Sequence, residues 1–406
     1  MKLRDYFLLS MVVTAVFACS SDDEIPEEQV FTPDATFSLA AEVNGKTGTK
    51  AIQNEIKNAE DAIHTLRVLV FSGQTDEAPY QTEGSSTNTN VVEDIPVESG
   101  EATILVLAND QLSRDAFVGK TLSEALNLTF SLDNESLESG LTMSSALLKT
   151  NIAPNMHNIY GNLEDFADSH QPNVSLGGVI DLVRHIAQIN LKSLTINKNA
   201  SFVLEEMFVA NVKGYTNVAA NSLSKWGPVE TETAPTDGKL WWYGDCVEDN
   251  GKYKTIEEEN AVKKEAILSW SPTSPTTVEF GKGLKPAEGE FSYGKSFYVY
   301  ENNLSGNAPL GERTLLILKG TYIGSQGEEK NRFYTVSVND PDMGTLTEND
   351  GTVSHKYIKR NYRYNISLNI KSSGSDRPYD PASEACMDIA ISVANWDVVD
   401  MNENLD

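Results

Sequence analysis

The sequence predicts a mostly β protein with room for two domains. Short runs rich in Val, Ile, Thr, Tyr and Phe recur along the chain, and Gly, Asn, Asp or Pro residues bound them, which is the pattern of strands joined by turns. Helix-favouring patterns are few and lie between residues 121 and 148. A length of 406 residues suits one large or two medium cores, and typical domain sizes favour two.

The N-terminus has the features of a bacterial secretory signal. Basic Lys2 and Arg4 precede an apolar segment, and small Ala18 stands directly before Cys19, as in a signal that is removed after export. The residues from position 16 to Cys19 resemble a lipobox, in which the cysteine is lipidated (diacylglycerol and palmitate) and becomes the new N-terminus. We therefore expect a lipoprotein signal peptide over residues 1–18 and a lipid anchor on Cys19 that holds the precursor at the outer membrane.

The stretch from position 31 to Val43 predicts one strand with a buried face. Apolar or small side chains occupy every second position, with Phe37, Leu39 and Val43 as the large ones. A period of two over this length is typical of a strand that packs on a core.

An exposed linker follows this strand. A turn dipeptide stands at 44–45, and no large apolar side chain occurs from there to Ala51, as in segments that proteases reach. We interpret residues 19–50 as a propeptide with a removable strand, cut between Lys50 and Ala51. The alternative is an ordinary first strand followed by an ordinary loop.

Further strands are predicted along the rest of the chain, with loops at 72–89 and 374–384 and two short helical patterns at 123–128 and 135–148. The apolar pattern restarts at Arg184, so we place an N-terminal domain at 51–183 and a C-terminal domain at 184–406. The predicted strands are 66–71, 102–108, 176–183, 186–196, 202–212, 296–301, 314–319, 333–338 and 362–371.

The region from 218 to 290 is irregular and contains four of the five tryptophans. Clustered aromatic residues in a long insertion suit a platform for a glycan or partner, with Trp241 and Trp242 as its centre. The competing interpretation, which is the commoner one, is a satellite core that pins a long loop.

The last segment, about 385–406, resembles the first in its pattern. Apolar side chains alternate through Ile389, Ile391 and Val393, and then shift phase to Trp396 and Val398. A phase change within an apolar run indicates a bulge or a crossing between sheets. This strand ends in a free acidic terminus, so it is well placed to leave its own domain.

Charge and motif content disfavour several classes of function. The net charge of −27, from 59 acidic and 32 basic residues, disfavours nucleic acid and anionic membrane surfaces as partners. The five histidines lack metal-ligand spacing, and no nucleophile elbow, phosphate loop or Cys-x-x-Cys occurs. We expect no metal, no cofactor and no enzymatic activity. Cys246 and Cys386 are expected as separate thiols, with a disulfide between them as the alternative.

Several motifs together resemble the fimbrillins of Bacteroidetes type V pili. They are the lipobox, the linker at Lys50, the LRVLVF strand from 66 to 71, and the segments 297–302, 359–364 and 393–396. The resemblance implies two transthyretin-like β-sandwich domains and removal of the N-terminal strand after a basic residue. It further implies that the groove so opened accepts the C-terminal strand of the next subunit. The family site is usually Arg-Ala, whereas this chain has Lys50-Ala51.

The leading hypothesis is therefore a structural subunit of an adhesive fimbrium at the cell surface. Its partners would be copies of itself, tip and anchor subunits, and a processing protease. A tip or anchor subunit of the same pilus and a surface glycan-binding lipoprotein are the alternatives, and an acid/base glycosidase has the least support.

Overall fold

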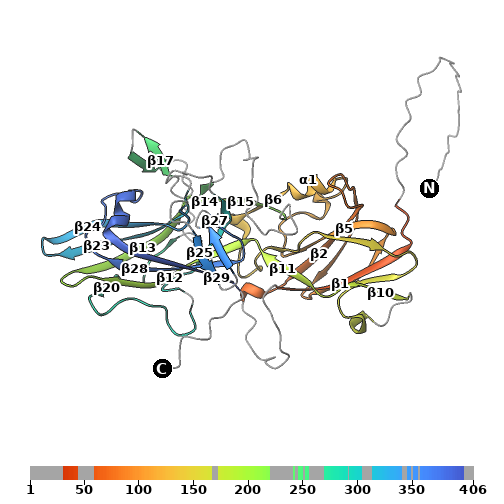
Figure 1. The fold of residues 1–406 in the computed structure, drawn as a ribbon, viewed down its shortest axis with the longest axis horizontal. Helices are drawn as coiled ribbons and strands as arrows, with labels where there is room; N and C mark the ends of the chain where they lie inside the picture. Colours follow the sequence, from red (N-terminus) through yellow and green to blue (C-terminus); the bar gives the residue numbers. More distant parts are fainter. Residues whose placement is uncertain are drawn as a thin grey trace, which may run out of the picture. The chain divides into compact units, whose positions relative to one another are not determined.

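The computed structural model describes residues 31–43, 59–166, 172–219, 241–242, 246–249, 252–255, 269–290, 292–303, 313–340, 345–348, 351–354 and 357–396. Strands dominate, so the predicted mostly β fold class is confirmed. Everything from Pro33 onward forms one unit, in which the strands assemble into several sheets (Figure 1). In this part of the chain, no helix has both the length and the apolar character needed to cross a membrane.

The largest sheet has ten strands, all of which lie before residue 185. Eight of them follow the order β10-β9-β1-β11-β7-β5-β2-β3, while β4 pairs with β1 and β8 pairs with β5. The strands are β1 (Ala35–Val43), β2 (Thr65–Ser72), β3 (Tyr80–Thr87), β4 (Val91–Val97), β5 (Gly100–Ala108), β7 (Met143–Ser144), β8 (Leu148–Ile152), β9 (His157–Tyr160), β10 (Asn173–Gly177) and β11 (Ile180–Arg184).

Two further sheets are built from strands after residue 185. One has four strands in the order β21-β12-β28-β29. The other has five strands, of which four follow the order β19-β13-β23-β24 and the fifth, β20, pairs with β13. These strands are β12 (Ile186–Ile196), β13 (Ser201–Ala210), β19 (Ser269–Trp270), β20 (Thr276–Glu279), β21 (Phe297–Tyr300), β23 (Leu315–Gly324), β24 (Gly327–Ser337), β28 (Tyr362–Ile370) and β29 (Met387–Asn395).

Five two-stranded ribbons complete the sheets, and the pair β6–β15 joins a strand before residue 185 to one after it. The pairs are β6 (Thr129–Ser131) with β15 (Tyr215–Asn217), β14 (Val212–Lys213) with β16 (Trp241–Trp242), β17 (Cys246–Asp249) with β18 (Lys252–Thr255), β22 (Asn302–Asn303) with β27 (Tyr357–Ile358), and β25 (Thr345–Glu348) with β26 (Gly351–Ser354).

The strand β2 shows why the large sheet is stable. It pairs with β3 and β5, and its side chains from Leu66 to Phe71 are buried on both faces. The charged residue in this run, Arg67, is buried as well, because its guanidinium donates to Glu83 at 2.7 and 3.0 Å and lies over the ring of Phe117. A buried charge that is paired in this way does not carry the cost of an isolated ion.

Several predicted elements are wrong. The predicted loop at 72–89 contains β3, an edge strand whose half-exposed, polar side chains give no apolar alternation. Of the two helical patterns, the first forms the helix α1 (Leu122–Leu126), whereas the second, 135–148, contains β7 and the start of β8. At its middle Gly140 has φ +84° and packs against Asn109, an arrangement that a helix does not provide.

Candidate functional site

The strand β1 lies inside the large sheet with partners on both sides. It runs antiparallel to β4, with Ala35 opposite Val97, and parallel to two strands on its other side. Those are β9, beside the first half of β1, and β11, beside its end. Without β1, the sheet would therefore have a gap with strand edges along both sides.

Both faces of β1 are buried. On one face Phe37 and Leu39 are fully inaccessible and Val43 is 3% exposed, and the Phe37 ring packs edge-on against Tyr160 at 6.1 Å between centroids. On the other face, Ser38 is fully inaccessible and Ala40 packs with a small apolar cluster. Each large apolar side chain buried here contributes about 1.5–3 kcal/mol.

Polar contacts fix β1 in register. The Ser38 hydroxyl lies 2.7 Å from Nε2 of the buried His157 and accepts a hydrogen bond from the Asp94 amide at 2.9 Å. Side-chain amides of Asn90 and Asn158 donate to main-chain carbonyl oxygens of β1, at 3.0 and 3.3 Å. These last two contacts depend on the backbone of the inserted strand and not on its side chains.

The residue directly before β1, Asp34, makes hydrogen bonds at the surface. Asp34 accepts hydrogen bonds from the Ser99 amide and hydroxyl, both at 2.7 Å. Both hydrogen bonds lower the pKa of the Asp34 carboxyl below its ordinary value, and the bond from the Ser99 hydroxyl has the larger effect.

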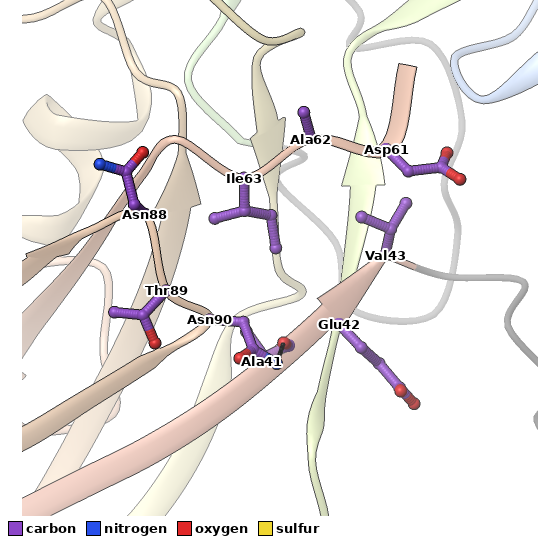
Figure 2. A pocket seen from close by; sticks show the side chains of 9 residues that line it. All are labelled: Ala41, Glu42, Val43, Asp61, Ala62, Ile63, Asn88, Thr89 and Asn90. Atoms are coloured by element: carbon purple, nitrogen blue, oxygen red, sulfur yellow. Dashed lines mark hydrogen bonds between the residues drawn. The ribbon is translucent and has the colours of Figure 1, made fainter. Parts of the chain in front are cut away.

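A pocket of about 300 Å³ lies at the other end of β1 (Figure 2). Residues 41–43 of β1 form one wall, and Asp61, Ala62 and Ile63 lie across from them. The remaining wall is the 88–90 turn that leads into β4. The pocket is thus bounded by the strand predicted to be removable and by the first described segment after the predicted cut.

The strand β29 occupies the edge of its sheet. It pairs antiparallel with β28 over its whole length, from Met387 opposite Ile370 to Asn395 opposite Tyr362. Ile389 and Ile391 are half-buried and Val393 is 5% exposed, whereas the intervening Ser392 faces solvent. In this structure the predicted donor strand therefore lies in the sheet of its own chain.

Trp396 follows β29 directly and is 2% exposed. Its indole Nε1 donates to the Glu60 carboxylate at 3.1 Å, across 336 positions of the sequence. The structure thus places the end of the predicted donor strand against the segment that follows the predicted cut. Val398 lies outside the described residues.

The remaining predicted sites are placed in part. Cys19, Lys50 and Ala51 lie outside the described residues. The backbones of Trp241 and Trp242 form β16, and nothing is described of their side chains. Residues outside that pair fit the satellite-core interpretation better, because the half-buried Trp270 packs edge-on against Tyr293 at 5.7 Å.

No cluster of three or more His, Cys, Asp or Glu that could hold a metal occurs among the residues described. Cys386 is a free, half-buried thiol.

Sequence reasoning missed two parts of this site. The first is β4, whose run from Val91 to Val97 is interrupted by charged residues and Pro96, so that its apolar positions lose a clear period. The second is Glu60, an acidic residue in a polar stretch that no local pattern marks as buried. Its partner Arg363, a charged residue in β28, is only 4% exposed.

These features define a class of protein, namely a mostly β protein in which an N-terminal strand lies inside one sheet and a C-terminal strand lies at the edge of another. Residues 35–184, which contain the large sheet, match the family model of the major fimbrial subunit protein FimA. A FimA type-2 major fimbrium subunit of Porphyromonas gingivalis is 26% identical, and the match covers 99% of both chains. A type-3 subunit of the same organism is also 26% identical over 99% of each chain.

Solved structures agree with these matches. A crystal structure from Parabacteroides distasonis, assigned to cell adhesion, has a TM-score of 0.60 at 25% identity and covers 90% of this chain and 99% of its own. A fimbrilin from Porphyromonas gingivalis has the same fold, with a TM-score of 0.56 at 20% identity over 90% of this chain and 99% of its own. The resemblance to the Bacteroidetes fimbrillins is confirmed, since the chain is similar to them in sequence and in fold.

Proposed function

We propose that this protein is a structural subunit of an adhesive fimbrium, made as a surface lipoprotein and polymerised by strand exchange. The observation that supports this most is the position of β1, which is buried on both faces and paired on both edges. Fimbrial subunits among the relatives support the same conclusion. The relatives also favour a structural role over an enzymatic one.

The proposed maturation begins with lipidation of Cys19 and ends with a cut between Lys50 and Ala51. Removing β1 would withdraw three large apolar side chains, each contributing about 1.5–3 kcal/mol, and leave the open edges of β4, β9 and β11. Such a gap needs a replacement strand. Strand addition supplies main-chain hydrogen bonds for affinity and alternate side-chain pockets for register.

The strand β29 of a second subunit is the proposed replacement. It has nine residues, as β1 does, and its apolar positions also alternate. Its other face carries Ala390 and Ser392, which resemble the small Ser38 and Ala40 of β1 in size. The Asn90 and Asn158 amides would bind the backbone of either strand.

Because donor and acceptor lie at different places on one chain, the contact would grow as an open filament. The change of sheet between β11 and β12, at residue 185, also supports the proposed domains 51–183 and 184–406.

The cut is tested by Lys50→Ala, with Lys46→Ala as the matched control. The first variant should leave a full-length, lipidated monomer, whereas the control should give filaments whose subunits begin at Ala51. N-terminal sequencing of sheared surface protein makes the measurement. Filaments formed by Lys50→Ala, or filaments that keep Cys19 on most copies, would contradict the proposal.

Donation is tested by Ile391→Asp in a subunit with an intact linker. In the monomer this side chain is half-exposed at a sheet edge, so the variant should fold, whereas an unpaired charge in an apolar groove is very costly. The variant should be cut normally, fail to polymerise alone, and cap filaments of unmodified subunits. Normal filaments from the variant would show that another segment is the donor.

A further inference from the structure

A buried polar cluster surrounds the carboxylate of Glu60, which is 5% exposed and lies ten positions after Lys50. One oxygen, Oε1, accepts hydrogen bonds from the Gln188 amide at 3.0 Å and the Tyr298 hydroxyl at 2.6 Å. The other, Oε2, accepts from the Arg363 guanidinium at 3.2 Å and from the Trp396 indole at 3.1 Å. We call these residues, with Asp61 and Arg184, the Glu60 cluster.

The charges of the Glu60 cluster balance without Trp396. Arg184 donates to the Glu60 carbonyl oxygen at 3.0 Å and pairs with the Asp61 carboxylate. Arg363 donates to the Gln188 side-chain oxygen at 2.9 Å in addition to pairing with Glu60. The two carboxylates of η1 (Ala59–Asp61) are thus paired with two guanidinium groups, one from β11 and one from β28. The Gln188 side chain of β12 completes this set.

Trp396 binds to this charge-balanced frame mainly through its ring. The indole stacks on the Tyr298 ring at 6.0 Å between centroids and 23° between planes, and the guanidinium carbons of Arg184 and Arg363 each lie 5.1 Å from its centre. Its backbone amide donates to the Asn361 carbonyl oxygen at 3.0 Å. Stacking and cation–π contacts of this kind stabilise a desolvated aromatic ring.

The departure of the indole would leave no buried charge unpaired. Glu60 Oε2 would retain Arg363, and both guanidinium groups would retain their carboxylates. Trp396 is therefore the detachable member of the cluster, while the other groups form a permanent frame. A buried ion pair that lost one of its members would be far costlier.

We propose that the Glu60 cluster is a binding site for the indole of Trp396, which retains β29 in its own sheet until the strand is donated. This rests on the proposed function, because only a strand that leaves needs a releasable anchor. β29 lies at the edge of its sheet, where it is hydrogen-bonded to β28 and its other face is exposed, so a contact at its end adds to its retention. Trp396 acts as a positioning residue for the donor.

The same site responds to the loss of β1. Asp61, Ala62 and Ile63 form the wall of the pocket that faces the end of β1 (Figure 2), and Asp61 and Glu60 hold the cluster on the other side. Removal of β1 would take away the wall of the pocket opposite Asp61, Ala62 and Ile63, and with it the packing beside the segment that carries Glu60. Release of the tail is therefore favoured in cut subunits over uncut ones, which orders processing before donation.

Hydrogen exchange of the uncut protein tests the retention site directly. The variant Trp396→Phe keeps a stacked ring and loses the hydrogen bond to Glu60, and Trp396→Ala loses both. Backbone amides of β29 should exchange about 10- to 100-fold faster in Trp396→Phe, since a hydrogen bond to a charged group is worth that much in an opening equilibrium. Exchange should be faster still in Trp396→Ala.

The matched control is Ser392→Ala, at a solvent-facing position of the same strand, which should leave exchange unchanged. Unaltered exchange of β29 in Trp396→Ala would overturn the proposal. Equal acceleration in β29, β28 and β12 would also overturn it, because the tryptophan would then stabilise the whole sheet.

A second experiment compares the unmodified protein before and after the cut. The backbone amides of β29 should exchange faster after the cut. Equal rates would overturn the proposal that processing precedes donation. Filament formation by the cut protein is measured separately. If β29 exchanges faster after the cut but no filaments form, strand donation is contradicted, whereas the retention site is still supported.

Discussion

β1 and β29 share a length of nine residues and an apolar pattern of period two, yet the fold holds them in opposite ways. β1 has hydrogen-bonded strands on both edges and buried side chains on both faces, whereas β29 is hydrogen-bonded to β28 on one edge and has one solvent-facing side. The same pattern can therefore occur in a strand that is enclosed by its sheet and in a strand at the edge of one. Position in the sheet, more than sequence, separates the proposed acceptor groove from the proposed donor strand.

Truncation of one apolar residue in each strand should affect β1 much more than β29. Leu39→Ala removes a fully buried side chain and should lower the free energy of unfolding of the uncut protein by about 2–5 kcal/mol. Ile391→Ala, at a half-buried edge position, should cost about 1 kcal/mol. Denaturant unfolding of both variants makes the measurement. Equal losses of unfolding free energy would show that the side chains of β1 and β29 contribute equally to stability.

A polar pair of variants sharpens the same comparison on the opposite faces. Ser38→Ala leaves His157 and the Asp94 amide without their hydroxyl partner and should cost about 1–3 kcal/mol. Ser392→Ala faces solvent and should change the free energy of unfolding by less than about 0.5 kcal/mol. Thermal unfolding of the uncut chain checks both values. A loss in Ser392→Ala as large as in Ser38→Ala would mean that the outer face of β29 is covered.

The smallest expected effect concerns pH and the junction between the two halves. His185 is fully buried between β11 and β12, with Nε2 2.8 Å from the Ser144 hydroxyl. Burial, together with the Arg360 charge, lowers its pKa well below the ordinary value. The unfolded chain takes up this proton below about pH 6.5, while the folded chain does not.

The stability that neutral His185 contributes is therefore complete above that pH and decreases as pH falls below it, by at most about 1.4 kcal/mol per pH unit. His185→Gln should show a shallower loss than the unmodified protein between pH 7 and 5.5 in denaturant unfolding. Identical slopes would show that His185 does not contribute to this loss.

The sequence could predict those elements whose hydrophobic pattern lies within one segment of the chain. The strands around Phe37, in β28 and in β29 were predicted because each has a period-two apolar pattern within a single segment, and β2 was predicted because it is a continuous apolar run apart from Arg67. β3 was not, since a polar edge strand has no such pattern. The Glu60 cluster was not predictable either, because the hydrogen-bond partners of the Glu60 carboxylate lie 128 to 336 positions away in the sequence. Burial of an ion pair follows from tertiary packing, which no local spacing records.

The central claim is that the gap left by β1 accepts β29 from another subunit. Its most direct test is a protein that begins at Ala51, mixed with a synthetic peptide of residues 387–396 or, as the reference, of residues 35–43. Both peptides should bind and raise the melting temperature, whereas a 387–396 peptide with Ile391→Asp should do neither. Stabilisation by the 35–43 peptide alone would rule out β29 as the replacement strand, since the groove would then recognise only its own strand.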